Sequence, residues 1–306
     1  MNNNITYPIA YNNITNQLVE IQNVTKDNKE NLICNECKDN FVAVINHQTP
    51  HFRHKPDSNC IGSLESYIHW VSKEIFKTIQ EIEIPELTID ELPEKQRQKF
   101  QKMYNEILDQ NIHDTLRSRF RKSFKNNLTE SKRIKIYNIE IEKQYKTPIG
   151  DIRVDIVSNF QNKEIFIEPF FTNSIDKTKK AKLELLETST LSINLKKFIE
   201  YYNSNYSIQI LKDYLISKES KKWAFLSNKT YDKCIKDYKE YLNTEIKKNE
   251  ELINSHTIKL EEFSSLMLQR NKLEINLNQI QNKISELNIK LRELGEEVGI
   301  PYEDWS

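Results

Sequence analysis

Glycine is scarce in this sequence, with only 4 in 306 residues. The phosphate-binding loops of P-loop nucleotide hydrolases and of dinucleotide-binding folds require several glycines at fixed spacing, so both classes are excluded. Long apolar runs are also missing. No stretch approaches the roughly 18 to 20 residues of a membrane helix, and the Asn-rich start lacks the charged and apolar regions of a signal peptide. We therefore expect a cytoplasmic protein that does not bind membranes.

The chain also lacks an excess of either charge. Its 45 basic residues balance its 45 acidic residues, which argues against a uniformly basic nucleic-acid coat. Hydrophobic residues make up 37%, below the roughly 45 to 50% of compact domains. Part of the chain is therefore expected to be elongated or polar on all sides. The length predicts two or three structural units at ~100 to 200 residues each.

Cysteine and histidine residues gather between positions 34 and 69. The spacing Cys34-x-x-Cys37 lets two thiolates bind one zinc ion. The second pair of ligands must come from His51, His54 and Cys60, in the segment HFRHKPDSNC. Five candidates compete for four tetrahedral positions, and we favour Cys34, Cys37, His54 and Cys60, with His51 as the substitute. The alternative is a set of free cytosolic thiols with ordinary surface histidines.

The periodicity of the chain predicts an α+β fold. Residues 5–24 alternate apolar and polar side chains around an Asn-Asn turn, as a hairpin does. A helix is expected after Ser63, which can cap it, and residues 94–126 continue as one or two helices. From residue 133 the period changes to two. Strands are predicted at 133–146, 152–158, 164–171 and 191–195, with a helix at 174–187, which gives a mixed sheet with flanking helices.

Residues 231–294 contain no Pro or Gly and are predicted to form one continuous helix. Its distal half has the heptad pattern of a coiled coil. Seven apolar residues alternate at spacings of four and three: Leu273, Leu277, Ile280, Ile284, Leu287, Leu291 and Leu294. Upstream, polar residues interrupt this seam. We expect the segment to form a homodimer, to bind a partner protein, or to pack antiparallel on its own proximal half.

Two acidic residues lie inside apolar strands. Asp155 lies within IRVDIV, and Glu168, 13 residues later, within IFIEPF. Burying a carboxylate is costly unless it meets a cation, so the pair suggests a divalent ion such as Mg²⁺ or Mn²⁺, with Glu142 as a third ligand. Such a site can activate water for attack on a phosphodiester. The alternative is that both residues lie on the solvated face of a half-exposed sheet.

A basic segment precedes these strands. Residues 117–135 contain eight basic residues and one acidic residue, with Phe120 and Phe124 between them. This pattern suits contact with a nucleic-acid backbone, although a solvated helix face would look similar. The residues predicted to bind nucleic acid are Arg117, Arg119, Arg121, Lys122 and Lys125.

Several short motifs appear in an order that resembles the competence-protein CoiA-like family. They are Cys34-Asn-Glu-Cys37, His51-Phe-Arg-His54, Glu65-Ser-Tyr-Ile-His69 with Lys73, Arg153-Val-Asp155-Ile-Val and Ile167-Glu168. The resemblance covers roughly residues 5–195 and excludes the heptad segment. It implies a zinc-ribbon-like module fused to a nuclease-like domain of the PD-(D/E)XK type.

Roles for single residues follow from the resemblance. Asp155 and Glu168 would bind the catalytic metal, with Glu65 or Glu142 as an auxiliary carboxylate. Glu65, His69 and Lys73 recur every four residues, so they share one helix face that could point at the site.

The sequence departs from the family pattern two residues after Glu168. There the family commonly has Lys or Gln, and this chain has Phe170. A lysine of the following helix could replace it, from among Lys177, Lys179 and Lys180, and we expect Lys179.

The sequence thus predicts three parts: a hairpin and zinc-knuckle module at 1–62, a nuclease-like domain at 63–228 with inserted basic helices at 94–130, and a coiled coil with its tail at 229–306. The expected function is metal-dependent DNA cleavage in DNA uptake, processing or defence against foreign DNA. The alternative is a catalytically inactive DNA-binding scaffold that recruits a partner through its coiled coil.

Overall fold

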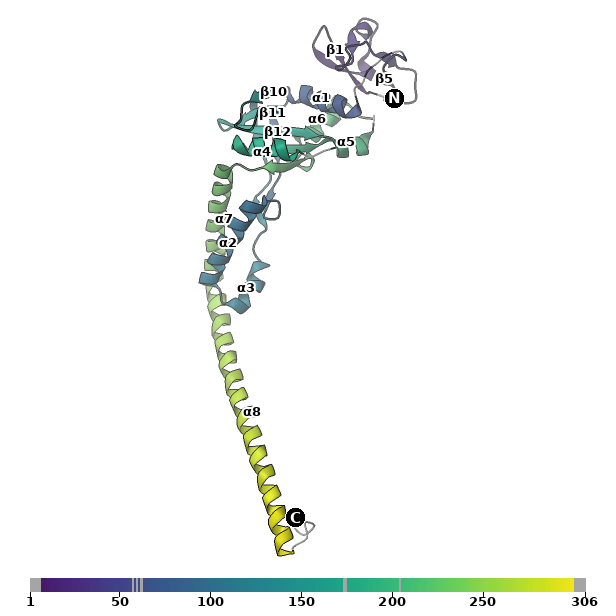
Figure 1. Ribbon diagram of the computed structural model, residues 1–306. Helices are drawn as coiled ribbons and strands as arrows, with labels where there is room; N and C mark the ends of the chain where they lie inside the picture. The colour runs from purple at the N-terminus through teal and green to yellow at the C-terminus, as the bar shows by residue number, and fades with distance from the viewer. Residues whose placement is uncertain are drawn as a thin grey trace. The chain divides into compact units, whose positions relative to one another are not determined.

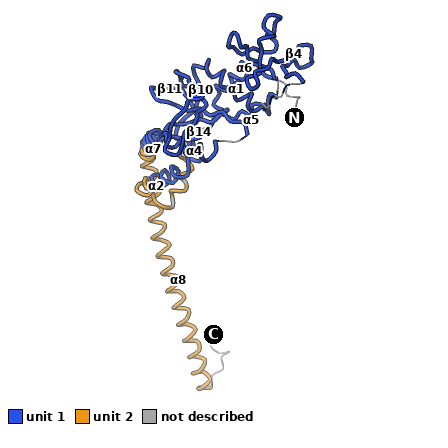
Figure 2. The backbone as a smooth tube through the Cα atoms, turned by 45° about the horizontal axis from the view of Figure 1, so that its top comes forward, with its two compact units in different colours: residues 1–103, 125–240 blue, residues 104–124, 241–306 orange. Residues whose placement is uncertain are grey.

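The computed structural model of the chain describes residues 7–299 except 57, 59, 61, 62, 173, 174 and 204. The protein has the predicted α+β fold with a long C-terminal helix (Figure 1). Contacts divide the chain into two compact units, one of residues 1–103 and 125–240 and the other of residues 104–124 and 241–306 (Figure 2). This division differs from the predicted boundaries, because residues 1–62 and most of 63–228 share the first unit.

The first unit begins with the predicted hairpin. Strands β1 (Ile9–Asn12) and β2 (Gln17–Glu20) pair antiparallel, and the Oδ1 atom of Asn12 accepts hydrogen bonds from two N–H groups of the turn. Strand β3 (Leu32–Ile33) pairs on the other side of β1. Strands β4 (Val42–Val44) and β5 (His51–Arg53) form a second small sheet.

Helix α1 (Leu64–Phe76) begins at the predicted cap. The Oγ atom of Ser63 accepts a hydrogen bond from the backbone N–H of Ser66, which satisfies one of the free donors of the first turn. The hydroxyl of Tyr67 donates to the carbonyl of Ile9 at 2.7 Å and accepts from its N–H at 3.1 Å. The small N-terminal sheets are therefore joined to α1 by hydrogen bonds as well as by apolar packing.

A five-stranded mixed sheet forms the centre of the first unit, in the order β10-β11-β12-β13-β14. Neighbouring strands are antiparallel except β12 and β13, which are parallel. Helices α1 and α5 (Leu195–Tyr202) contact β12, and α4 (Lys177–Leu185) covers the other face through Leu183 (Figure 1). The strands are β10 (Tyr137–Tyr145), β11 (Ile152–Phe160), β12 (Lys163–Phe170), β13 (Thr190–Asn194) and β14 (Lys221–Phe225).

Strands β11 and β12 separate where the two predicted acidic residues lie. Their antiparallel ladder ends at the pair Ile156 and Ile167. Beyond it, β11 pairs only with β10, and the segment from Glu168 to Phe170 pairs only with β13. A proline at 169 is tolerated there, because no partner strand needs its missing N–H. A cavity borders Asp155 and Glu168 where the strands separate.

Shorter elements connect these parts. The predicted strand 133–146 is two strands, because β9 pairs with β6 while β10 joins the main sheet. Strand β14 was not predicted. The connecting elements are β6 (Glu81–Ile84), β7 (Leu87–Thr88), α2 (Glu94–Asn111), α3 (Asp114–Arg121), β8 (Asn127–Thr129), β9 (Lys132–Lys135) and α6 (Ile208–Ile216).

The C-terminal region is helical but not continuous, so the predicted single helix is wrong. Helix α7 (Asn228–Lys248) ends one residue before α8 (Glu250–Val298), and Asn249 between them has φ −103° and ψ 9°. Helix α8 runs unbroken for 49 residues (Figure 2). Its seam residues from Leu273 to Leu294 are 51 to 66% exposed. Among the described residues, the seam is therefore solvent-exposed along its length.

None of the described helices combines the length and the apolar character that crossing a membrane requires. Helix α8 is long enough, but charged and amide side chains interrupt it throughout.

Candidate functional site

Four predicted zinc ligands converge in the N-terminal sheets. One ligand atom from each of Cys34, Cys37, His54 and Cys60 lies within 4.8 Å of all the others. The Sγ atoms of Cys34 and Cys60 are 3.9 Å apart, close to the ~3.8 Å between two sulfurs bound to one tetrahedral zinc ion. This Cys₃His cluster is a group that could hold a metal such as zinc.

Local structure positions the ligands. Cys34 follows β3, and its carbonyl accepts from the N–H of Lys38 in a tight turn. Lys38 itself has φ 61°, which places it in the left-handed region. His54 follows β5, and its Nε2 atom is buried without a hydrogen-bond partner in the described part of the chain. A buried polar atom of this kind is costly unless a ligand such as a metal satisfies it.

The four favoured residues gather in one group, and their substitute does not. His51 lies outside the cluster, and its Nδ1 atom donates to the carbonyl of Thr49 at 2.8 Å. Burial raises the pKa of Cys34 to about 12 and also raises the pKa of Cys37. Raised pKa values favour protonated thiols, which are weak nucleophiles, so the cluster is a candidate metal site and not a set of reactive thiolates.

Asp155 and Glu168 lie together where β11 and β12 separate. Both carboxylates are buried, with 9% and 2% of the residue exposed. The backbone N–H of Asp155 points at Oε1 of Glu168 at 3.4 Å, where the ladder would otherwise continue. The alternative of a solvated sheet face is therefore wrong for this pair.

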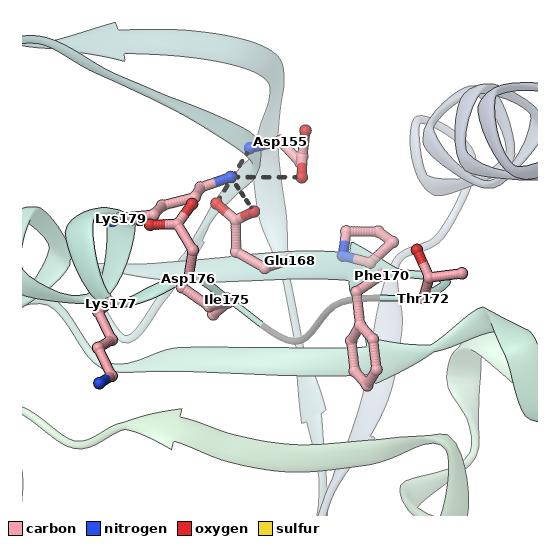
Figure 3. A pocket seen from close by; sticks show the side chains of 9 residues that line it. Asp155, Glu168, Phe170, Thr172, Ile175, Asp176, Lys177 and Lys179 are labelled. Atoms are coloured by element: carbon pink, nitrogen blue, oxygen red, sulfur yellow. Dashed lines mark hydrogen bonds and ion pairs between the residues drawn. The ribbon is translucent and has the colours of Figure 1, made fainter.

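Lys179 reaches the acidic pair from helix α4. Its Nζ atom forms an ion pair with Glu168 and lies 3.6 Å from Oδ2 of Asp155 (Figure 3). Asp176 caps α4 by accepting from the N–H of Lys179 at 2.8 Å, which fixes the first turn of the helix. The cap thus positions the lysine that the sequence predicted for this role.

Helix α1 supplies two further groups. Nε2 of His69 lies 3.0 Å from the carbonyl oxygen of Pro169 and 3.3 Å from Oδ2 of Asp155. Both neighbours are acceptors, so Nε2 carries the proton and donates to them. Nζ of Lys73 lies 3.8 Å from Oδ1 of Asp155. The predicted polar face of α1 therefore points at Asp155 through these two residues.

The two predicted auxiliary carboxylates lie apart from the acidic pair. Oε1 of Glu142 accepts from Lys73 at 2.6 Å, so a lysine lies between Glu142 and Asp155. Glu65 accepts from the hydroxyl of Thr172. Among the described residues, no third carboxylate joins the pair in a group compact enough for one ion. Glu142 also has φ 57° in mid-strand, a costly conformation that often marks functional sites.

The surroundings of Asp155 and Glu168 shift the pKa values of the two carboxyl groups in opposite directions. Burial raises the pKa of Asp155, but hydrogen bonds from His69 and Glu168 and the charge of Lys179 outweigh it, so the net pKa is lowered. Burial and the neighbouring Asp155 raise the pKa of Glu168 to about 8, despite Lys179. The surroundings of the pair therefore favour the charged form of Asp155 and disfavour the charged form of Glu168.

The predicted nucleic-acid-binding arginines are partly occupied within the second unit. Arg117 forms ion pairs with Asp109 and Asp114 at 2.7 and 2.5 Å. Arg121 donates to Oδ1 of Asn105. Lys122 is exposed, and so is Lys125, which belongs to the first unit. The side chain of Arg119 lies outside the described part of the structure. The segment is therefore less free to bind phosphates than its composition suggests.

Comparison with known proteins gives no relative for this chain: no family model, no curated protein and no solved structure matches it. The geometry of the two sites therefore carries the functional assignment.

Proposed function

We propose that this protein is a cytoplasmic, Mg²⁺- or Mn²⁺-dependent nuclease of the PD-(D/E)XK type, with a structural zinc knuckle. One observation carries the proposal: a buried aspartate and glutamate meet at the separation of two central strands, with a lysine from the next helix directed at both. The motif order that resembles CoiA-like proteins supports the same assignment. Cleavage of foreign or imported DNA is the process that this resemblance suggests.

The carboxylates fit the proposed metal. Mg²⁺ prefers a few carboxylate oxygens and fills its other positions with water and substrate phosphate, and Asp155 and Glu168 offer such oxygens at one point. When bound there, the ion supplies Lewis-acid chemistry and a more acidic coordinated water. A divalent cation would offset the burial and the Asp155 charge that raise the pKa of Glu168, so metal binding would favour the charged form of both carboxylates.

The protein's own residues would then position the reacting groups. Asp155 and Glu168 hold the charge that attracts the metal, and His69 fixes the orientation of Asp155 by its Nε2–H. Lys179 can bind the attacking water or a non-bridging phosphate oxygen, the task that Phe170 cannot perform. Preorganised charge of this kind lowers the barrier without reorganisation during the reaction.

Cleavage assays with single- and double-stranded DNA and added Mg²⁺ or Mn²⁺ test the proposal. Asp155→Asn and Glu168→Gln should each abolish metal-dependent cleavage. Asp213→Asn is the matched control, because Asp213 is exposed on α6 and lines neither pocket beside the acidic pair, so this variant should leave cleavage intact. Cleavage that survives both site substitutions would overturn the mechanism.

We further propose that the Cys₃His cluster binds zinc to stabilise the N-terminal sheets. Four protein ligands leave no open position for chemistry, as in structural zinc sites. Elemental analysis of protein purified without added metal should give close to one zinc per chain. Less than about half an equivalent, with normal folding, would refute this role.

Phe170 favours a second candidate function, that of an inactive nuclease fold which binds DNA and recruits a partner through α8. A phenylalanine in place of the usual Lys or Gln removes one catalytic group from the strand. This alternative predicts salt-sensitive DNA binding without divalent metal and no cleavage with any metal tested. Metal-dependent cleavage that Asp155→Asn abolishes would exclude it.

A further inference from the structure

A cavity of about 600 Å³ opens beside the acidic pair. Asp155, Glu168 and Lys179 form one end of it, so the cavity is continuous with the proposed cleavage site. Its remaining walls combine apolar and polar groups: Pro169, Phe170, Ile175, Thr172, Asp176 and Lys177 (Figure 3). The volume lies within the roughly 300 to 1,000 Å³ typical of small-ligand sites. It is large enough for one nucleoside beside a bound phosphate.

Phe170 is the aromatic group of this cavity. It lies at the end of β12, opposite Asn194 of β13 and beyond the point where β11 has left the sheet. Its side chain is only partly buried and belongs to neither of the hydrophobic clusters that flank the sheet, whereas Phe171 packs into one of them. Figure 3 shows its ring directed away from the carboxylates. The ring therefore serves no packing role comparable to that of Phe171.

A second cavity, of about 300 Å³, adjoins the first cavity near Asp155. It shares Asp155, Asp176 and Lys179 with the first cavity and is lined further by Arg153, Thr178 and Lys182. The two cavities thus meet at the proposed position of the cleaved phosphate. The second is polar and has no aromatic wall, because three carboxylates (Asp151, Asp155 and Asp176) and three cationic side chains (Arg153, Lys179 and Lys182) line it, whereas the first has the aromatic ring.

We propose that the Phe170 ring stacks on an unpaired nucleobase next to the cleaved phosphate, and that the substrate is single-stranded nucleic acid. The inference rests on the proposed function, because it places a phosphate at Asp155 and Lys179. A base inside a duplex has both faces covered by its neighbours, so it can stack on a side chain only when it is unpaired. Lys177 and Lys179 also line this cavity and supply positive charge to it. Phe170, which replaces the usual Lys or Gln, would thereby select for single-stranded substrates.

Binding to the full-length protein in Ca²⁺, which supports binding with little cleavage, tests the inference. The probes are a short single-stranded oligodeoxynucleotide, its duplex, and the single strand with 2-aminopurine in place of one base. Stacking on aromatic side chains contributes about 5- to 150-fold in affinity per base. Phe170→Leu, which keeps an apolar side chain but removes the ring, should weaken single-strand binding by that factor and abolish the 2-aminopurine quenching. Phe170→Tyr should restore both.

Tyr201→Ala is the control, because Tyr201 is 82% exposed on α5 and lies outside both cavities. It should bind like the wild type. Unchanged single-strand binding by Phe170→Leu, or a wild-type preference for the duplex, would overturn the inference.

A parallel cleavage assay in Mn²⁺ separates this inference from the proposed function. Quenching that depends on Phe170, without any cleavage, would refute the nuclease and leave the stacking site standing. Cleavage that Phe170→Leu leaves unchanged on single strands would refute the stacking site and leave the nuclease standing.

Discussion

Substituting His69 by phenylalanine tests how the acidic pair is oriented. The replacement keeps a planar ring on α1 and removes the Nε2–H that lies 3.0 Å from the carbonyl oxygen of Pro169 and 3.3 Å from Oδ2 of Asp155. Asp155 keeps its two neighbouring ammonium groups, Lys73 at 3.8 Å and Lys179 at 3.6 Å. The carboxylate therefore stays charge-compensated but loses its fixed orientation.

The structure limits the size of each effect. Because the His69 side chain is 26% exposed, water can replace part of the lost hydrogen bond, and we expect the free energy of unfolding to fall by only about 1 kcal/mol. Groups that orient a metal ligand matter more for the metal, typically about 10- to 100-fold in affinity or activity. The Mn²⁺ concentration that gives half-maximal cleavage should rise by that factor.

The assay is a Mn²⁺ titration of cleavage for the wild type, His69→Phe, His69→Gln and Lys77→Ala. Glutamine can still donate from its side-chain amide and should recover part of the metal affinity. Lys77 caps the C-terminal end of the same helix, where it pairs with Glu74, so its variant should match the wild type. An unchanged Mn²⁺ curve for His69→Phe would refute the orienting role. Calorimetric Mn²⁺ titration gives the same readout without cleavage.

Three further predictions concern the rest of the molecule. Burial lowers the pKa of Lys221 to about 7. Between about pH 7 and 10.5 the unfolded chain therefore binds more protons than the folded chain. The free energy of unfolding should rise across this range by up to ~1.4 kcal/mol per pH unit. Denaturant unfolding at several pH values should show that the free energy of unfolding of the wild type rises relative to that of Lys221→Met across this pH range. A difference that stays constant with pH would contradict the prediction. Cys60→Ser should lose zinc in elemental analysis and lower the melting temperature in zinc-containing buffer, whereas Cys234→Ser, at a buried thiol outside the cluster, should keep its zinc. If α8 forms a homodimer through its exposed seam, Ile284→Lys should halve the mass in light scattering and Ile289→Lys, at an equally exposed position off the seam, should not; a monomeric wild type would refute the dimer.

The Cys₃His cluster could be predicted from the sequence because the pattern that encodes it is local. The spacing Cys34-x-x-Cys37 fixes two ligands in one turn, and the competing histidines lie only three residues apart. Which of the two histidines joins the cluster depends on its position relative to β5. His51 lies in β5 and bonds to Thr49, whereas His54 follows the strand and meets the thiols. A preference for the residue nearer to Cys60 was sufficient to select His54.

Long-range pairing explains what the sequence did not reveal. Strand β14 is five residues long and pairs with β13, whose last residue precedes it by 27 positions, so no local period marks it. The break at Asn249 lies in a segment without Pro or Gly and leaves no signal that a helix rule would detect. The separation of β11 from β12 at Asp155 and Glu168 is likewise a property of the assembled sheet.

Lys179 supplies to the acidic pair the cationic group that position 170 lacks. Two substitutions test whether the two positions are related in this way. Charge reaches the acidic pair from the capped first turn of α4 and not from β12. Lys179→Met should reduce cleavage by about 10²- to 10³-fold, as loss of one preorganised donor does. Adding Phe170→Lys to that variant should not restore cleavage, because the side chain at 170 is directed away from the carboxylates (Figure 3). If the double variant cleaves like the wild type, a lysine at position 170 can reach the acidic pair, and the reasoning about Lys179 is refuted.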